Sequence, residues 1–212
     1  MNRPLILLGG GGHCKSVIEI CRQLNRHVMG ILDPIYPQAE PVLGVPVIGN
    51  DDDISKYVDH CDFIITVGAI ENPTTRISLF NRILTHNGRF TTLIAPSATV
   101  ASSATIGEGS VVLSGACVNA DAQIGRNVII NTLSAVEHDS VVEDHCHIST
   151  GAMVNGDCHI GRATFIGSNA TTINGITVGA NVIIGAGSTV ITNIYTPGVY
   201  VGSPARLVNK RP

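Results

Sequence analysis

Charge is scarce in this sequence. Only 14% of its 212 residues are Asp, Glu, Lys or Arg, where a soluble domain has about a quarter. The 13 basic and 16 acidic residues give a formal net charge of −3, and no Lys/Arg tract is present, which argues against electrostatic binding of nucleic acid. An apolar content of 44% also excludes a disordered chain, because disorder requires few apolar residues.

Long apolar runs are absent as well. No run reaches the roughly 18 residues that suggest a membrane-spanning helix, and the N-terminus lacks the small-residue cleavage pattern of a signal peptide. The six cysteines form no Cys-x-x-Cys pair. Without a secretion signal we interpret them as reduced thiols, and we expect a cytoplasmic protein.

Proline and lysine are missing from one half of the chain. Residues 97–196 contain neither, and their only arginines are Arg126 and Arg162. The composition changes near residues 92–96. This change predicts two domains, residues 1–92 and residues 93–212.

The first domain alternates strands with helices. Apolar runs at residues 5–8, 27–32 and 62–67 predict buried strands. Helical spacing predicts helices over residues 13–24 and 73–86. Strand–helix–strand units of this size imply a small parallel α/β sheet of Rossmann-like type, with right-handed crossovers.

The second domain repeats every six residues. Stepping by six from Ile94 to Val190 meets Val or Ile at 16 of 17 positions, with Thr172 as the exception. The residue four positions later is nearly always small, and Gly follows the aliphatic residue six times. A helix cannot hold a six-residue period on one face, whereas a parallel β-helix with three six-residue walls can. We therefore expect between five and six such three-walled coils, with the aliphatic side chains inside.

A glycine loop, Gly9–Gly12, stands between the first predicted strand and helix. Backbone N–H groups and the helix dipole at such a place can hold a phosphate. Asp33 lies where an acid meets a ribose hydroxyl in dinucleotide folds. The strict Gly-x-Gly-x-x-Gly pattern is absent because Lys15 replaces the third glycine, and the domain is too short for two mononucleotide-binding halves. A nucleotide-sugar is therefore favoured over NAD, with a purely structural turn as the alternative.

Histidines gather in the repeat domain, where four of the eight lie close together in sequence: His138, His145, His147 and His159. His138 follows the inward-pointing Val136 by two positions, so we expect it on an outer surface between Glu137 and Asp139. An imidazole suits deprotonation of an amine or hydroxyl that attacks a thioester, and a neighbouring carboxylate would orient the ring. The alternative is a solvated surface histidine.

A metal site is the other chemistry that clustered histidines suggest. No two of these four histidines show the five-residue spacing of zinc ligands in β-helix enzymes. Cys146 and Cys158 fall at the small inward position, which favours core packing over ligation. We expect no metal, and exposed polar positions for His145 and His159.

The repeat over residues 94–193 resembles that of the left-handed β-helix acyltransferases, and residues 201–206 (Val-Gly-Ser-Pro-Ala-Arg) are similar to the closing segment of that family. The glycine loop, Asp33 and Val67-Gly68 narrow the resemblance to the branch of sialic acid O-acetyltransferases and nucleotide-aminosugar N-acetyltransferases. Its most specific piece is Asn-Thr-Leu-Ser-Ala-Val-Glu-His-Asp at residues 131–139, followed by His147 and Gly156. The resemblance covers almost the whole chain.

The resemblance implies roles for individual residues. The histidine matching His138 is the general base of these enzymes, with a glutamate beside it, where this chain has the shorter Asp139. The residue matching His147 lies beside the acetyl-CoA thioester, and a backbone N–H at the position of Gly156 contacts the thioester carbonyl. Gly156 follows His138 by three six-residue repeats, so one coil should separate them, which suits an oxyanion contact.

Two groups of binding residues and an assembly also follow from the resemblance. Acetyl-CoA contacts are expected at His147, Gly156, Ala186 and Arg206. Substrate contacts are expected at Gly11, Gly12, His13, Asp33, Gly68 and Asn131. The resembling enzymes are homotrimers with the active site between adjacent prisms, and a flat wall does need a second wall to exclude water from a thioester.

The sequence thus predicts an acetyl-CoA-dependent N-acetyltransferase of glycan biosynthesis. Its substrate would be a nucleotide-linked amino sugar of the 4-amino-4,6-dideoxy type, attacked directly with His138 as base. A covalent acyl-enzyme has little support because neither Cys117 nor Cys146 has an evident base. Two alternatives stay open: an O-acetyltransferase acting on a sugar such as sialic acid, and a non-catalytic nucleotide-sugar-binding protein.

Overall fold

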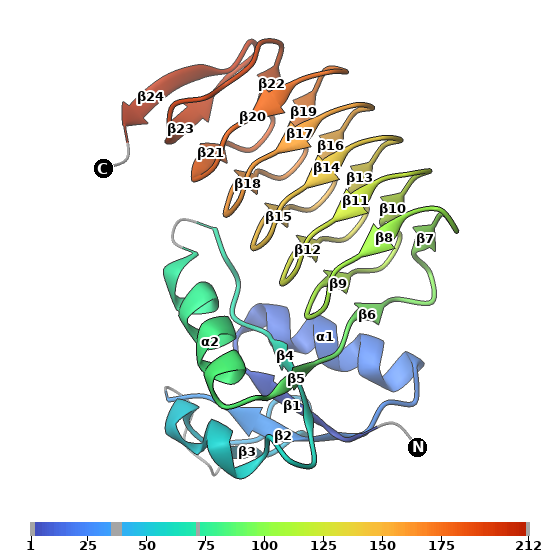
Figure 1. Cartoon of the computed structure of the whole chain (residues 1–212), viewed down its shortest axis with the longest axis vertical. Helices are drawn as coiled ribbons and strands as arrows, with labels where there is room; N and C mark the ends of the chain where they lie inside the picture. The colour runs from blue at the N-terminus through green and yellow to red at the C-terminus, as the bar shows by residue number, and fades with distance from the viewer. Residues whose placement is uncertain (1–2, 35–39, 71–72, 211–212) are drawn as a thin grey trace.

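The computed structural model describes residues 3–34, 40–70 and 73–210 of the chain. An α/β domain at the N-terminal end is followed by a stack of triangular coils, which is capped by the antiparallel strands β23 Gly198–Val201 and β24 Arg206–Lys210 (Figure 1). None of the helices in these three ranges combines the length and apolarity that crossing a bilayer requires. The two parts have the architectures predicted from the sequence, a parallel sheet and a left-handed β-helix.

The N-terminal sheet is parallel, with strand order β3-β2-β1-β4-β5. Its strands are β1 Leu5–Leu8, β2 Val28–Leu32, β3 Val47–Gly49, β4 Asp62–Ile65 and β5 Arg89–Phe90, and its helices are α1 Gly12–Gln23, α2 Thr74–Thr85 and the 3-10 helix η1 Asp51–Lys56. The sequence pattern did not indicate β3, η1 or β5, because such short segments carry little periodicity. The third predicted strand ends early, at Ile65, and the next residues border a cavity.

The β-helix has three walls of short parallel strands. The first wall contains β6 Leu93–Ile94, β9 Val111–Val112, β12 Ile129–Ile130, β15 His147–Ile148, β18 Phe165–Ile166 and β21 Val182–Ile184. The second contains β7 Thr99–Val100, β10 Cys117–Val118, β13 Ala135–Val136, β16 Met153–Val154, β19 Thr171–Thr172 and β22 Thr189–Val190. The third contains β8 Thr105–Ile106, β11 Gln123–Ile124, β14 Val141–Val142, β17 His159–Ile160 and β20 Thr177–Val178. Paired residues in neighbouring coils are three repeats apart, as predicted; Val118, for example, pairs with Val136.

Each six-residue repeat contributes one aliphatic residue and one small residue to the interior of its coil. From Val112 to Val190 the aliphatic position is buried, and Cys146 and Cys158 lie in the same core, as the sequence predicted. Where the small residue is polar, its hydroxyl links neighbouring coils. The Ser140 hydroxyl donates to the carbonyl of Asn155 (2.9 Å) and accepts from the N–H of Cys158 (3.1 Å). These bonds satisfy polar groups that burial would otherwise leave unpaired.

The corners of the triangle use a left-handed backbone. Every sixth residue from 109 to 187 has a positive φ: Gly109, Gly115, Asp121, Asn127, Leu133, Asp139, His145, Gly151, Asp157, Ala163, Asn169, Gly175, Asn181 and Gly187. Gly, Asn and Asp dominate because they tolerate this conformation best. The glycines that follow the aliphatic residues do something different. A Cβ on Gly125 would lie 2.6 Å from the backbone nitrogen of Asp144, so these glycines allow close approach between coils.

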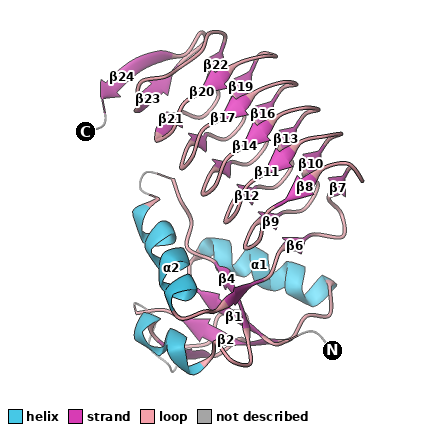
Figure 2. Ribbon diagram, in the orientation of Figure 1, coloured by secondary structure: helices cyan, strands magenta, loops and turns pink. Residues whose placement is uncertain are grey.

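Helix α1 joins the two domains. It lies between the N-terminal sheet and the lower coils of the first wall (Figure 2). Its buried residues, among them Cys14 and Val17, share one core with Val111, Leu113 and Ile129 of the β-helix. This shared apolar core holds the carboxyl ends of β1 and β4 close to the first wall.

Adding a methyl group where two coils touch should destabilise the β-helix. We expect Gly125→Ala to cost about 2 kcal/mol, because the new Cβ overlaps backbone atoms of the next coil. For a chain of this size this lowers Tm by about 4–8 °C. Gly179 occupies the same repeat position, but its Cβ would meet nothing closer than 3.3 Å. Thermal melts of Gly125→Ala and Gly179→Ala test the claim, and equal losses would contradict it.

Candidate active site

A cavity of about 610 Å³ lies where the N-terminal sheet meets the first wall. Its lining consists of Gly9, Gly11, Gly12, His13, Ser16, Asp33, Thr66, Val67, Gly68, Ile70, Asn131 and His147. The carboxyl ends of parallel strands are the usual ligand site of such sheets. All six residues expected to contact the substrate border this one cavity. Ser16, Thr66, Val67 and Ile70 were not predicted.

The glycine loop leaves backbone donors exposed to the cavity. Gly9 has a φ of +104°, and a Cβ there would lie 2.6 Å from the Val67 side chain, so its glycine serves the turn itself. Gly11 and Gly12 are different, because a Cβ on either would meet no atom within 4 Å. Gly12 also opens α1. The turn alone explains why residue 9 is a glycine. The absence of side chains at Gly11 and Gly12 suits a ligand that approaches a helix N-terminus.

Asp33 closes one side of the loop. Its carboxylate Oδ2 accepts a hydrogen bond from the N–H of Gly10, and the Asp33 side chain is buried. The hydroxyl of Thr66 donates to the carbonyl of Gly9 at 2.6 Å. The ends of β1, β2 and β4 are thereby tied to the loop that borders the cavity.

His147 crosses from the β-helix to the N-terminal domain. Its Nδ1 lies 2.9 Å from the carbonyl oxygen of Ala69, and its Nε2 lies 3.0 Å from Nδ2 of Asn131. The amide of Asn131 is oriented because its Oδ1 accepts from the N–H of Thr132 at 2.7 Å. A carbonyl can only accept, so Nδ1 carries the proton and Nε2 accepts from Asn131. This network fixes one neutral tautomer. The structure therefore places His147, expected to contact acetyl-CoA, among the expected substrate contacts.

The histidines near this cavity are neutral. Burial lowers the pKa of His147 to about 4 and that of His13 to about 3. Within the described part of the chain, Nε2 of His13 is buried without a hydrogen-bond partner. The His13 side chain also lines the cavity, and a buried polar atom without a partner is unusual in proteins.

His138 lies on a different corner, between the second and third walls, and is exposed. Its Nδ1 donates to Oδ2 of Asp139 at 2.8 Å, so the shorter aspartate does reach the ring. The left-handed φ of 61° at Asp139 accompanies this adjacent pairing. The hydrogen bond to Asp139 raises the pKa of His138 above its usual value. Glu137 accepts from Nδ2 of Asn119 (2.8 Å), which leaves Asp139 as the carboxylate that orients the ring.

Gly156 lies against the His138 ring, as their separation by three repeats indicates. A Cβ on Gly156 would be 2.6 Å from Nε2 of His138, so only glycine leaves room for the imidazole. Within the described residues, the N–H of Gly156 makes no hydrogen bond. Asn174, one coil further on, would lie 3.1 Å from the same Cβ. Asn174 was not predicted, although stepping one further coil from Gly156 leads directly to it.

The remaining expected residues lie elsewhere. Ala186 and Arg206 are both exposed near the C-terminal end of the β-helix, Arg206 at the start of β24 (Arg206–Lys210), and neither borders the cavity. His159 is exposed and pairs with Glu143 (2.8 Å), in line with the expected polar wall. No group of three or more metal-ligand side chains occurs among the residues that the structure describes. The absence of a metal stays a prediction.

The prediction for His145 was wrong. It is only 3% exposed, its Nδ1 lies 2.9 Å from Nδ2 of Asn127, and its ring meets Phe80 edge-on with centroids 5.2 Å apart. The position would be exposed in an isolated β-helix. Helix α2, which carries Phe80, covers it.

Two protein families match separate parts of the chain. The family described as the PglD N-terminal domain matches residues 4–83. The family of bacterial transferase hexapeptides, six repeats, matches residues 157–192.

Solved structures extend the likeness to nearly the whole chain. PerB from Caulobacter crescentus, in complex with CoA and GDP-perosamine, is 33% identical over 97% of each chain, with a TM-score of 0.91. The acetyltransferase domain of PglB from Neisseria gonorrhoeae, in complex with acetyl coenzyme A, is 33% identical over 98% of this chain and 100% of that one, with a TM-score of 0.91. WeeI from Acinetobacter baumannii, at 24% identity and a TM-score of 0.84, shares the fold. The chain therefore belongs to the hexapeptide-repeat, left-handed β-helix acyltransferases, in the branch that joins this β-helix to a PglD-type N-terminal domain.

Proposed function

We propose that the chain is an acetyl-CoA-dependent N-acetyltransferase that acts on a nucleotide-linked amino sugar of the 4-amino-4,6-dideoxy type. The observation that carries this proposal is the corner where Asp139, His138 and Gly156 meet, because it combines an oriented base with a backbone donor. The two matched acetyltransferases support it, since one was solved with CoA and GDP-perosamine and the other with acetyl coenzyme A.

The nucleotide part of the substrate would occupy the cavity. The N–H groups at Gly11 and Gly12 suit the diphosphate, and Asp33 suits a ribose hydroxyl. His13, Gly68 and Asn131 border the same space. In this proposal residues 1–92 form the nucleotide-sugar-binding domain and residues 93–212 the acetyltransferase domain.

The reaction would be direct acyl transfer. Nε2 of His138 removes a proton from the sugar amine while the amine nitrogen attacks the thioester carbon, and Asp139 holds the proton on Nδ1 and stabilises the imidazolium. The negative charge on the carbonyl oxygen is met by the N–H of Gly156. The intermediate then collapses, the C–S bond breaks, and the imidazolium returns the proton to the departing thiolate. No protein nucleophile is needed.

Acetyl-CoA would lie along the β-helix, with contacts at Gly156, Ala186 and Arg206. His147 would complete this set from the cavity, where its ring is held by Ala69 and Asn131. Its place suits a residue at which the acetyl group and the sugar amine meet.

A homotrimer would bring the two parts of the site together. His138 does not border the cavity of its own chain. Exposed apolar side chains lie along the second wall: Met153 on its outer face, Ile173 and Ile191 on the side of the His138 corner, and Leu133 at the opposite corner. Such a strip is suited to burial against a second copy. That copy could then present its own cavity to His138.

We place the enzyme in the cytoplasm, in glycan biosynthesis. All six cysteines are free thiols in the structure, which suits a reducing compartment.

Offering matched substrates tests the proposed function. We expect a nucleotide 4-amino-4,6-dideoxy sugar to release CoA from acetyl-CoA, and NMR to locate the new acetyl group on nitrogen. UDP-, dTDP- and GDP-linked sugars should be tried in parallel, each beside its 4-hydroxy counterpart and free sialic acid. Turnover of only a hydroxyl compound would overturn the N-acetyltransferase and favour an O-acetyltransferase. Absence of CoA release with every acceptor would favour a binding protein.

The base can be tested through its pH profile. His138→Ala should lower kcat roughly 10²–10⁴-fold and leave the KM for acetyl-CoA nearly unchanged. The base works when neutral, and Asp139 raises the pKa of His138, so Asp139→Asn should lower that pKa. The acidic limb of kcat/KM should then move to lower pH. The substrate amine is common to both enzymes, so the difference between profiles belongs to the protein.

Glu137→Gln is the matched control, because Glu137 is the neighbouring carboxylate but pairs with Asn119. It should move the acidic limb less than Asp139→Asn does. A His138→Ala enzyme with near-normal kcat at neutral pH, or an acidic limb that Asp139→Asn does not move, would refute the assignment.

A further inference from the structure

Arg76, in the first turn of α2, is a buried cation. It is 1% exposed, and none of the ion pairs between described residues includes it. Burial lowers the pKa of Arg76 to about 9, so it is protonated at neutral pH. A buried charge without a counter-ion is costly and rare in proteins. This cost suggests that the charge of Arg76 performs a task that a neutral side chain could not.

Backbone carbonyls hold the guanidinium directly behind the cavity wall. Nη1 donates to the carbonyls of Ile65 (2.5 Å) and Val67 (3.0 Å), and Nε donates to that of Asn127 (3.3 Å). Val67 borders the cavity. Nη2 is buried with no partner among the described residues. The charge therefore lies directly behind the residues that line the cavity, and backbone carbonyl dipoles stabilise it.

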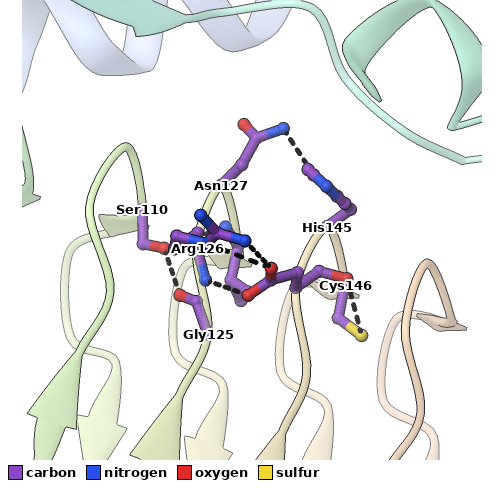
Figure 3. A network of polar contacts seen from close by, with 8 residues as sticks. Ser110, Gly125, Arg126, Asn127, His145 and Cys146 are labelled. Atoms are coloured by element: carbon purple, nitrogen blue, oxygen red, sulfur yellow. Dashed lines mark hydrogen bonds and ion pairs between the residues drawn. The ribbon is translucent and has the colours of Figure 1, made fainter. Parts of the chain in front are cut away.

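The nearby β-helix corners do not neutralise this charge. Figure 3 shows Asn127 and His145 extending from adjacent corners, and their side chains bond each other at 2.9 Å. Burial lowers the pKa of His145 to about 4, so it is neutral at pH 7. The carboxylate of Asp144 accepts from two guanidinium nitrogens of Arg126, at 2.9 and 3.1 Å. Asp144 is thus already paired.

The field of Arg76 reaches the cavity. It adds to burial in lowering the pKa of both His13 and His147, which line the cavity. That lining contains no Lys or Arg within the described residues, and its one carboxylate is Asp33. Lys15, the basic residue nearest in sequence to the glycine loop, borders a separate pocket. Asp33 would therefore repel a multiply charged anion in the cavity, and the buried Arg76 would attract it.

We propose that Arg76 supplies, without touching the ligand, the positive potential that retains the diphosphate of a nucleotide in this cavity. This inference rests on the proposed function. The N–H groups at the start of α1 make the hydrogen bonds, while the buried guanidinium supplies a full charge in a region of low dielectric. Arg76 is thus a determinant of specificity for charged nucleotides over neutral nucleosides.

Two variants separate charge from geometry. Arg76→Gln keeps a hydrogen-bond donor for the carbonyls but removes the charge, and Arg76→Lys keeps the charge. For whichever of GDP, UDP or dTDP binds the wild type, we expect Arg76→Gln to weaken the diphosphate about 10–30-fold. The matching nucleoside should change far less. Arg76→Lys should keep the ratio of diphosphate affinity to nucleoside affinity that the wild type has. Calorimetry for the diphosphate and ligand-observed NMR for the nucleoside give these values.

Equal weakening of both ligands by Arg76→Gln would show a structural role and overturn the proposal. Loss of the ratio between diphosphate and nucleoside affinity in Arg76→Lys would also overturn the proposal. If melting curves show that Arg76→Gln does not fold, the result for Arg76→Lys decides alone. CoA affinity should be unchanged in both variants. A wild type that binds no nucleoside diphosphate would overturn the proposed function and this inference together, whereas normal binding with an unchanged ratio in Arg76→Gln overturns only the inference.

Discussion

The in-register pairing of strands in successive coils is the constraint on which the rest of the structure depends. Each coil is hydrogen-bonded to the next in strict register, so a side chain at one corner meets the equivalent positions one and two coils further along. This register places Gly156 against His138 and brings Asn174 next to them. A Cβ on Gly156 would lie 2.6 Å from Nε2 of His138, so the imidazole can hold its present position only beside a glycine. The imidazole consequently packs against a stretch of backbone with an N–H that the ladder does not use.

The second constraint is the shared core between α1 and the first wall. It brings the carboxyl ends of β1 and β4 to the first wall, where Asn131 and His147 lie, and the resulting cavity is lined by residues of both domains. Polar bonds then lock the junction: His147 to the carbonyl of Ala69, and Arg76 to the carbonyl of Asn127. The cavity can therefore keep its shape only while the two domains stay docked.

Features set by spacing along the chain could be predicted from the sequence, whereas features set by domain docking could not. The six-residue period predicted the coils, the core positions of Cys146 and Cys158 and the neighbourhood of His138 and Gly156. The burial of His145 was missed because Phe80 of α2 covers a corner that the repeat alone leaves open. The contact of His147 with Ala69 was missed for the same reason, since Ala69 is 78 residues away in the other domain. Asn174 is different: it was not predicted, although the register of the coils alone places it next to Gly156.

In the proposed homotrimer, catalysis requires the His138 corner of one chain and the cavity of another. Co-expressing His138→Ala and Asp33→Ala chains with different tags tests this most directly. Each variant alone should have little activity, His138→Ala because its kcat is low and Asp33→Ala when the nucleotide-sugar is kept below its KM. Random mixing in a cyclic trimer leaves about one site in four with an intact base from one chain and an intact cavity from its neighbour, so about a quarter of wild-type activity should return. Activity no greater than the sum of the two separate variants would contradict the account and place the whole site within one chain.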